Sequence, residues 1–389
     1  MTSRIAAASA GKGPLNKLLD EALAAVHRQQ PELHPDLGLC FLTNHFEDDV
    51  EQVARRLREA TGVKTLLGCT AESVIGPEHE HENQPALAVW FAELPGVELR
   101  PFAIEMADMG AANSPAAFQS LVQVHGDPPA CYLVLGDPFT LDIDALLGGI
   151  NRQVPGVPVF GGMASGAEAP GQTGLIWNDE VRHEGAVGVA LAGDVPVRTV
   201  VSQGCRPIGK PLVITRAERN IIHTLGGRKA LEVLNEIFHA LPTSEQALAR
   251  QGLFIGRAIN EQKETFQTGD FLIRNLMGAD ETTGVLAVND LVRVGITVQF
   301  HVRNATTADA ELRSMLKAEA GAKPAGALLF SCNGRGTRMF PMPDHDVRVL
   351  QEVLGPMPVA GFFCAGELGP VGGKNFIHGH TASIALFKA

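Results

Sequence analysis

The sequence predicts an α/β protein of two mixed-sheet domains, built from repeated units of strand, helix, strand, small-residue loop and strand. Three observations support this prediction. The chain has 389 residues, of which 45% are hydrophobic, which is enough for two globular domains with buried cores. Apolar runs typical of buried strands alternate with segments of helical periodicity. A loop of small residues recurs at the same point of this alternation.

Each of three units begins with an apolar strand, followed by a helix that has aspartate at its start. In the first unit "LGLCFLT" is followed by Asp48 and Asp49, in the second "CYLVLGD" is followed by Asp142, and in the third "GALLFSCNGRG" is followed by Asp346. We expect these aspartates at the N-cap or in the first turn, where unpaired backbone amides accept a carboxylate.

A second strand then leads into the small-residue loop, and a third strand closes each unit. The number of residues from the first apolar position of the helix to a glycine of the loop is 18 (Val50 to Gly68), 18 (Ile143 to Gly161) and 14 (Val347 to Gly361). A strand, a helix and a strand of this length form a crossover that places the two strands parallel. Any α/β protein shows such alternation, so it is the recurring loop that favours a repeat.

We expect three parts along the chain. Residues 1–35 form a flexible lead and a short amphipathic helix. Residues 36–226 form an α/β domain with the first two units, and residues 227–389 form a second α/β domain with the third unit. Strands are also expected between the second and third units, among them a hairpin that turns near residues 218–220.

Composition and charge exclude several classes of protein. A formal net charge of −11, one Tyr and two Trp argue against a nucleic-acid partner. No apolar run is long enough to span a membrane, and the first 35 residues lack the apolar core of a secretory signal. Six scattered cysteines are typical of a reduced, cytoplasmic protein. Nucleotide-binding motifs are absent, so no cofactor is expected.

The stretch "SCNGRG" is the sharpest local signal for a ligand site. It follows an apolar strand, and ligands gather at the carboxyl ends of strands in open α/β sheets. Two glycines flank Arg335, so we expect this side chain to project from a tight turn whose amides can hold an anion. We therefore expect Asn333, Gly334, Arg335 and Gly336 to contact a ligand. The alternative is a turn whose arginine is solvated.

A second glycine-rich loop, "FFCAGELGPVGGK", supplies further candidates. Gly366 allows close approach of a ligand to the backbone, and Glu367 can hold an amine. We expect Cys364, Gly366, Glu367 and Lys374 to contact the ligand. A thiol that follows two phenylalanines is usually a small core residue, so Cys364 is expected to form a pocket wall.

The histidines that follow leave an enzyme as an alternative. On a strand His378 and His380 would share one face, and either could act as a base for Cys364 or Cys332 in a thiol-dependent reaction. Half of a metal site is another possibility for this pair, but we expect no metal. The acidic stretch "EHEHE" (residues 78–82) also has metal-like composition, and we expect it to be a solvated loop.

Several separated motifs together resemble the FIST family. They are "LLGCTAESVIG", "GCRPIGKPLVITRAERNIIHTLGGRKALEVL", "SCNGRG" and "GFFCAGELGPVGGKNFIHGHTASIALF". The resemblance implies a FIST N-like domain over residues 36–226 and a FIST C-like domain after it. It further implies a sensory domain that binds small ligands such as amino acids and acts in signal transduction. It provides no assigned catalytic residues.

The function expected from these observations is a cytoplasmic small-molecule sensor that binds amino acids or related small carboxylates in loops at strand ends. The 35 residues before residue 36 are too few for an F-box, and no kinase, cyclase or chemoreceptor segment follows the FIST-like region. We therefore expect the signal to pass through a separate partner protein. The alternatives are a thiol-dependent enzyme and a protein-interaction scaffold.

Overall fold

The computed structural model describes residues 2–388 except 113, 196, 264 and 267–268. Within it the chain forms two compact units. The body comprises residues 1–201 and 313–389, and the inserted unit comprises residues 202–312. The fold is α/β with mixed sheets, as the sequence predicts. The cut near residue 226 expected from the sequence lies inside the inserted unit, so compact units and sequence modules divide the chain differently.

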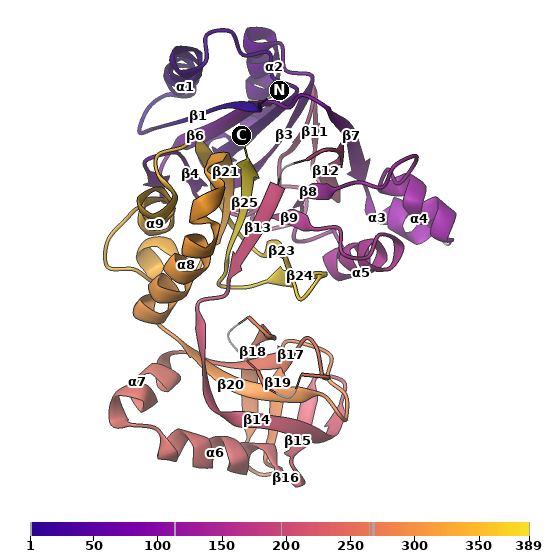
Figure 1. The fold of residues 1–389 in the computed structure, drawn as a ribbon, viewed down its shortest axis with the longest axis vertical. Coiled ribbons are helices and arrows are strands. Elements are labelled where there is room, and N and C mark those ends of the chain that lie inside the picture. Colours follow the sequence, from indigo (N-terminus) through magenta and orange to yellow (C-terminus); the bar gives the residue numbers. More distant parts are fainter. Residues whose placement is uncertain (1, 113, 196, 264, 267–268, 389) are drawn as a thin grey trace. The chain divides into compact units, whose positions relative to one another are not determined.

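The body is built from three repeats of one arrangement (Figure 1). The order along each repeat is an edge strand, helical segments, a strand, a helix, a parallel strand, a two-stranded hairpin and a closing strand. The first repeat contains β1 (Arg4–Gly11), α1 (Leu15–Gln29), β2 (Leu37–Thr43), η1 (Asn44–Asp49), α2 (Val50–Thr61), β3 (Thr65–Ala71), β4 (Val74–Ile75), β5 (Glu80–His81) and β6 (Ala86–Glu93).

The second and third repeats follow the same order. The second contains β7 (Val97–Ile104), α3 (Met106–Ala111), α4 (Pro115–Leu121), β8 (Cys131–Gly136), α5 (Ile143–Gln153), β9 (Val159–Met163), β10 (Leu175–Trp177), β11 (Glu180–Arg182) and β12 (Ala186–Gly193). The third contains β13 (Val197–Ser202), α8 (Ala305–Glu319), η2 (Ala320–Ala322), β21 (Pro324–Cys332), η3 (Gly336–Arg338), α9 (His345–Leu354), β22 (Val359–Cys364), β23 (Glu367–Val371), β24 (Lys374–His378) and β25 (Ala382–Lys388). The chain between β13 and α8 interrupts this last repeat, and the inserted unit consists of this stretch with Ser202 and the part of α8 up to Leu312.

The three sheets of the body have the same strand order, and each borrows its last two strands from another repeat. The orders are β1-β6-β2-β3-β10-β11, β7-β12-β8-β9-β23-β24 and β13-β25-β21-β22-β4-β5. In each repeat the two strands that flank the α2, α5 or α9 helix pair in parallel, as expected from the crossover length: β2 with β3, β8 with β9 and β21 with β22. The hairpin of each repeat pairs antiparallel with β3, β9 or β22 of a different repeat. The exchange is cyclic, so each repeat completes another one.

The loop glycines that revealed the repeat share one structural role. Each faces a carbonyl of the parallel neighbour so closely that a Cβ would collide with it. The distances from an added Cβ to that oxygen are 2.0 Å (Gly68 to Cys40), 1.9 Å (Gly161 to Val134) and 1.7 Å (Gly361 to Leu329). Glycine is therefore required where the two parallel strands approach, at the same register position in all three repeats.

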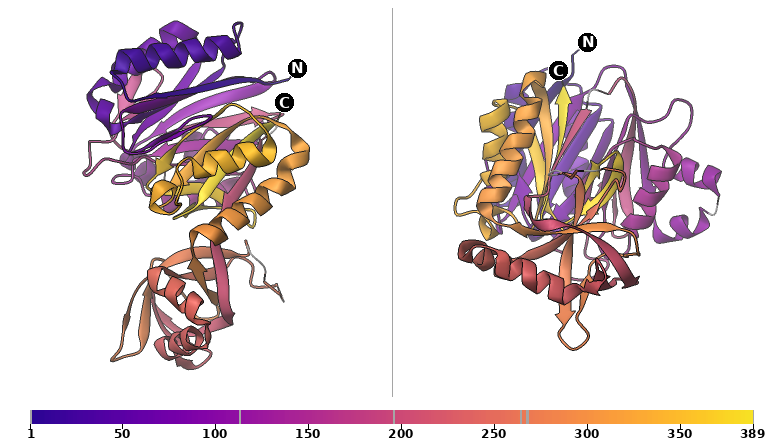
Figure 2. Two further views of the ribbon diagram at one scale, coloured as in Figure 1. Left: turned by 90° about the vertical axis from the view of Figure 1, so that its left-hand side faces the viewer. Right: turned by 60° about the horizontal axis from the view of Figure 1, so that its bottom comes forward.

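Both faces of these sheets are buried, which explains the continuous apolar runs in the sequence. On β2, for example, Leu39 and Phe41 enter a central core shared by the three sheets, whereas Cys40 and Leu42 pack under the helices. Figure 2 shows α1 and α2 along the outer face of their sheet. The apolar positions of α5 likewise cover the second sheet.

One local expectation needs correction. The predicted flexible lead is largely strand β1, which pairs with β6 and packs under α1. Of the helix-start aspartates, Asp142 caps α5 by accepting the amide of Ala145 at 2.9 Å. Asp49 occupies the N-cap position of α2 without a side-chain hydrogen bond. The hairpin expected near residues 218–220 is confirmed, with Arg219 at φ 52° between two strands.

The inserted unit is a closed antiparallel barrel with two helices. Its strands are β14 (Cys205–Glu218), β15 (Ile221–Leu225), β16 (Arg228–Lys229), β17 (Leu253–Ala258), β18 (Phe271–Asp280), β19 (Val285–Val288) and β20 (Thr297–Arg303). Six of them form a ring in the order β14-β20-β17-β18-β19-β15, which pairing of β15 with β14 closes. The helices are α6 (Ala230–Ala240) and α7 (Thr243–Gln251). In the described part of the chain, no helix is long and apolar enough to cross a membrane.

Gly361→Ala should lower the free energy of unfolding by about 1–3 kcal/mol or more, because the new methyl group overlaps a backbone oxygen that cannot move alone. The matched control is Gly321→Ala, where an added Cβ meets no atom within 4 Å, and it should be neutral or slightly stabilising. Chemical denaturation of both variants measures the difference. Equal stabilities would contradict the requirement for glycine at this register position.

Candidate functional site

The carboxyl ends of β3, β9 and β22 meet where the small-residue loops of all three repeats join. Ser165 of the second repeat is the hub of this junction. Its hydroxyl accepts the amide of Glu72 from the first repeat at 2.9 Å and donates to the carbonyl of Phe363 from the third. Two backbone hydrogen bonds complete the contact. The amide of Met163 donates to the carbonyl of Gly366 at 2.8 Å, and the amide of Ala365 donates to the carbonyl of Met163 at 3.0 Å. The predicted loops at strand ends thus converge on one place in the body.

An anion is held directly after the turn at residues 333–336, by Thr337, and this anion belongs to the protein. Glu82, from the segment after β5, accepts the amide of Thr337 at 3.0 Å and also its hydroxyl at 2.7 Å. Gly336 has φ 55°, and a Cβ there would lie 2.7 Å from that carboxylate. The space that Gly336 leaves is therefore filled by the side chain of Glu82, from the first repeat.

Arg335 does not project from the turn, and this expectation is wrong. The residue is 0% exposed. Its guanidinium holds the carboxylate of Asp346 through two hydrogen bonds, both 2.7 Å long. Burial opposes ionisation of Asp346, but the charge and hydrogen bonds of Arg335 outweigh it and keep the pKa of Asp346 below its usual value. Ser331 donates to the same carboxylate at 2.7 Å, and the ring of Phe340 lies 5.2 Å from the guanidinium carbon. The pair fixes the turn onto α9.

The acidic stretch 78–82 is likewise not a solvated loop throughout. Glu80 is 5% exposed, and its carboxylate accepts the amides of Asp346 and Val347 at 2.8 and 3.0 Å, at the start of α9. Burial, with the nearby charge of Asp346, raises the pKa of Glu80 to about 8. In the described residues, no group of three or more His, Cys, Asp or Glu is arranged to hold a metal ion.

The second predicted loop is divided between the core and the surface. Cys364 and Glu367 are both 0% exposed, and burial followed by the charge of Glu367 raises the pKa of the Cys364 thiol well above its usual value. Glu367 accepts the amide of Thr381 at 3.0 Å. Gly366 packs against the side chain of Ile377, 2.7 Å from an added Cβ.

Lys374 lies apart from this loop. It is exposed and opens β24 at the tip of the hairpin, four residues along β23 from Glu367, or about 13 Å of extended chain. The structure therefore does not bring Lys374 together with the turn at 333–336.

The two histidines do not share a strand face. His378 is the last residue of β24 and is buried, with its Nε2 3.0 Å from the carbonyl oxygen of Gly369. His380 lies beyond the strand at φ 60°, against Gly334, where an added Cβ would be 2.7 Å from its Nδ1. The paired arrangement expected for a metal or a catalytic base is therefore wrong.

Polar groups that the sequence analysis did not select surround the turn. Arg338 forms an ion pair with Glu72 and donates to the carbonyl of Asn333 at 2.9 Å. The side chains of this pair are 51% and 24% exposed. Two amide oxygens, those of Asn44 and Asn333, are buried and have no hydrogen-bond partner among the described residues. Gly166 packs on the Asn44 amide, 2.7 Å from an added Cβ.

These residues could have been sought by symmetry. Glu72 lies in the recurring loop after β3, and Asn44 and Asn333 follow β2 and β21, which are corresponding strands of two repeats. We call Asn44, Glu72, Asn333 and Arg338 the rim cluster. It lies at the carboxyl ends of strands from the first and third repeats, and Gly166 joins it to the second.

Arg335→Ala should destabilise the protein by about 3–5 kcal/mol, because it leaves the carboxylate of Asp346 buried without its cation. The matched control, Arg338→Ala, removes a half-exposed partner three residues away and should cost about 0–1 kcal/mol. Urea denaturation of the two variants checks the contrast. A small effect of Arg335→Ala would refute its structural role.

The free energy of unfolding should depend on pH through the titration of Glu80. The folded state keeps its proton up to about pH 8, whereas the unfolded chain releases it near the usual pKa of glutamate. The stabilisation of the folded state by the protonated Glu80 is therefore fully present at low pH. It is lost as the pH rises to about 8, by at most about 1.4 kcal/mol per pH unit. In Glu80→Gln this pH-dependent loss of stability is absent. The stability of wild type relative to Glu80→Gln should fall from pH 5 to pH 8, and a constant difference would contradict the assignment.

Matches to known protein families and to individual proteins cover nearly the whole chain. Residues 36–228 match the FIST N domain, and residues 230–370 match the FIST C domain. The uncharacterized protein Rv0628c of Mycobacterium tuberculosis (strain ATCC 25618 / H37Rv) is 40% identical over 370 residues, which cover 94% of this chain and 95% of that protein. The uncharacterized protein Mb0898c of Mycobacterium bovis is 40% identical over 358 residues, 91% of this chain and 90% of that protein. The chain therefore belongs to the FIST family.

Proposed function

We propose that this protein senses a small zwitterionic molecule, such as an amino acid, at the rim cluster. FIST domains are associated with sensing in signal transduction. The observation that carries the proposal is the Arg338–Glu72 ion pair, whose side chains are 51% and 24% exposed. The rim cluster also contains two amide oxygens, those of Asn44 and Asn333, that are buried without a hydrogen-bond partner among the described residues. It lies at the carboxyl ends of the strands, where loops from all three repeats converge.

The ion pair is complementary to the two charges of an amino acid. A half-exposed pair contributes only about 0–1 kcal/mol, so a ligand can open it at little cost. The ligand carboxylate then takes the guanidinium of Arg338, and its ammonium takes Glu72. The amide oxygens of Asn44 and Asn333 would accept the remaining ammonium protons.

The residues selected from the sequence take different parts in this proposal. Asn333, Gly334 and Gly336 form the turn under the ligand, and Arg335 holds that turn in place through Asp346. Cys364 and Gly366 form the floor of the loop junction. We place the protein in the cytoplasm, and we keep residues 36–226 and 227–389 as its two sequence modules. The signal passes to a separate partner protein.

A panel of free amino acids and related small carboxylates, screened by thermal shift, tests the proposal. At about 100 times Kd a ligand that binds only the folded state adds about 2.7 kcal/mol of stability, or several degrees in Tm for a unit of this size. Arg338→Ala and Glu72→Gln should each abolish the shift. Arg228→Ala, which removes another exposed ion pair in the inserted unit, should keep it.

Three results of this experiment would contradict the proposal. No shift with any compound of the panel would reject amino acids as the ligand class. A shift that survives both rim substitutions would reject the rim cluster as the site. A shift that Arg228→Ala also abolishes would show that loss of surface charge, and not loss of the rim pair, is responsible.

The thiol-enzyme alternative makes an opposite prediction for Cys364. Because burial raises the pKa of this thiol well above its usual value, it should react with iodoacetamide far more slowly in the native protein than after denaturation. Peptide mass spectrometry of timed samples measures the rate. Fast labelling of native Cys364 near neutral pH would favour the enzyme over the sensor.

A further inference from the structure

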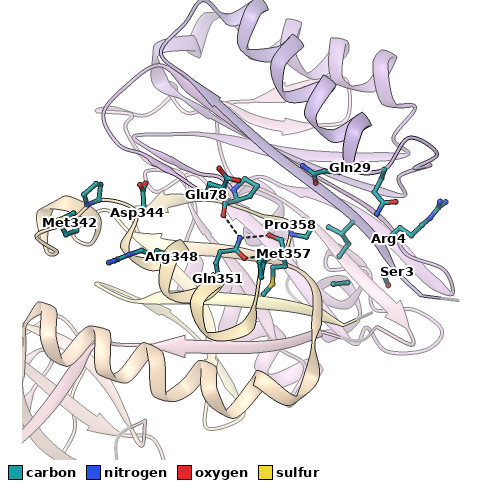
Figure 3. Close-up of a pocket in the computed structure, with 16 residues that line it drawn as sticks. Ser3, Arg4, Gln29, Glu78, Met342, Asp344, Arg348, Gln351, Met357 and Pro358 are labelled. Carbon is teal, nitrogen blue, oxygen red and sulfur yellow. Dashed lines mark hydrogen bonds between the residues drawn. The ribbon is translucent and has the colours of Figure 1, made fainter.

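A groove of about 1030 Å³ lies between the first and third repeats, and its charges favour no single class of occupant (Figure 3). Two arginines and two acids line it, namely Arg4, Arg348, Glu78 and Asp344. None of its described lining residues is a cysteine. The nucleophilic groups that the rim cluster does not use lie elsewhere in the body, at the ends of two neighbouring strands.

Two cysteines end neighbouring parallel strands at the same register position. Cys332 is the last residue of β21, Cys364 is the last residue of β22, and the two are direct partners in the ladder. Neighbouring strands lie about 4.8 Å apart. A disulfide usually joins Cα atoms that are about 4.4–6.8 Å apart. A bridge between these two residues therefore requires no large movement of either strand.

Both side chains lie on the core face of the sheet. Successive side chains of a strand point to opposite faces, so Cys332 shares a face with Phe330, and Cys364 shares one with Phe362. Phe330, Phe362 and Cys364 all belong to the central core of the body. Ser331, which precedes Cys332, points the other way, toward α9. The two sulfurs thus lie on one side of the sheet, and rotation about the Cα–Cβ bonds can bring them together.

The two thiols differ in their access to solvent. All six cysteines lie in the described part of the chain, and Cys332 alone among them is not buried. Cys364 is 0% exposed, so an oxidant from solution reaches Cys332 first. Burial, more than the neighbouring charges, raises the pKa of the Cys364 thiol well above its usual value. Cys364 therefore does not compete with Cys332 for the oxidant.

The surroundings of Cys332 stabilise a negative sulfur. The amide of Gly334 donates to its Sγ at 3.4 Å. A Cβ on Gly334 would lie 3.7 Å from this sulfur and 2.7 Å from Nδ1 of His380, so the imidazole lies near the thiol. The pKa of Arg338 is raised mainly by its hydrogen bond with Glu72, and the charge of Cys332 adds to this rise. Such donors and cations favour the thiolate, which is the form that reacts with peroxides.

We propose that Cys332 and Cys364 form a reversible disulfide when a peroxide oxidises the protein. The Cys332 thiolate attacks one oxygen of the peroxide and becomes a sulfenic acid, with the loss of two electrons from sulfur. The O–O bond breaks, and the second oxygen leaves as water with the proton that the thiol had lost. The sulfur of Cys364 then displaces the hydroxyl group, which takes the proton of Cys364 and leaves as a second water. A dithiol restores both thiols and is itself oxidised to a disulfide.

The bridge would lie directly beneath the rim cluster. The amide of Asn333 donates to the carbonyl of Cys364 at 3.0 Å, and its own carbonyl accepts a hydrogen bond from Arg338 at 2.9 Å. Because Cys332 is partly exposed, a reductant can reach the bridge as readily as the peroxide reaches the thiol. The bridge needs only the two thiols, so it does not depend on the ligand proposed above.

The test treats the native, full-length protein with hydrogen peroxide. Remaining thiols are then blocked with iodoacetamide in urea, and peptides are mapped by mass spectrometry without reduction. Two of the six thiols should be lost, and the main linked pair should join the peptides of Cys332 and Cys364. Dithiothreitol should restore both thiols. When urea is present during oxidation, the register of the strands is lost and several pairings should appear instead.

Three variants assign the roles of the thiols. Cys364→Ser should leave Cys332 as a sulfenic acid that dimedone traps, and Cys332→Ser should abolish the loss of thiols. The matched control is Cys69→Ser, which removes another buried thiol near Cys364 and should keep the bridge. Circular dichroism verifies that each variant is folded.

Three results would overturn the proposal, and the first two need only the wild-type protein. They are the absence of the Cys332–Cys364 pair from the oxidised native protein, formation of this pair only in urea, and loss of the pair in Cys69→Ser.

Discussion

The cyclic exchange of hairpins is the constraint on which the body depends. Each repeat sends its hairpin into the sheet of another repeat, so no single repeat has a complete sheet of its own. Because exposed sheet edges and apolar faces are costly, the three repeats must fold together to satisfy them. The small-residue loops make this exchange of hairpins possible. They let three chain segments cross within hydrogen-bond distance of one another, as the bonds of Ser165 show.

The same exchange explains why charged side chains are buried at the junction between repeats. The β4–β5 hairpin of the first repeat is carried to the start of α9 in the third, where Glu80 meets free helix amides. On the other side of Asp346, Arg335 supplies a cation, so one carboxylate is ionised and the other is driven toward its protonated form. Two carboxylates in one dry site can coexist only when their environments push their pKa values apart. This network fixes the junction between repeats.

The sequence predicted the repeats and the parallel strands, because these follow from local pattern and short spacing. It also singled out Gly68, Gly161 and Gly361, but as loop residues, whereas the structure has them inside β3, β9 and β22. It did not predict strand β1, since "RIAAASA" becomes a strand only through pairing with β6. Nor could it show that the barrel interrupts the third repeat, because β13 and β25, which pair, are separated by nearly half of the chain. The turn at residues 333–336 follows strand β21, as predicted, but its arginine is buried and does not project from it. Burial of Arg335 depends on Asp346, which the local turn sequence does not reveal.

The contrast between two arginines three residues apart decides where binding is chemically feasible. A guanidinium that is 0% exposed and doubly bonded to a buried carboxylate can accept a ligand only if that carboxylate is left unpaired, at a cost of several kcal/mol. Arg338 can change partners at the cost of a weak surface pair. Since binding free energy is what remains after such costs, the exposed arginine is the better receptor for a carboxylate. The buried one is better suited to holding the turn that presents it.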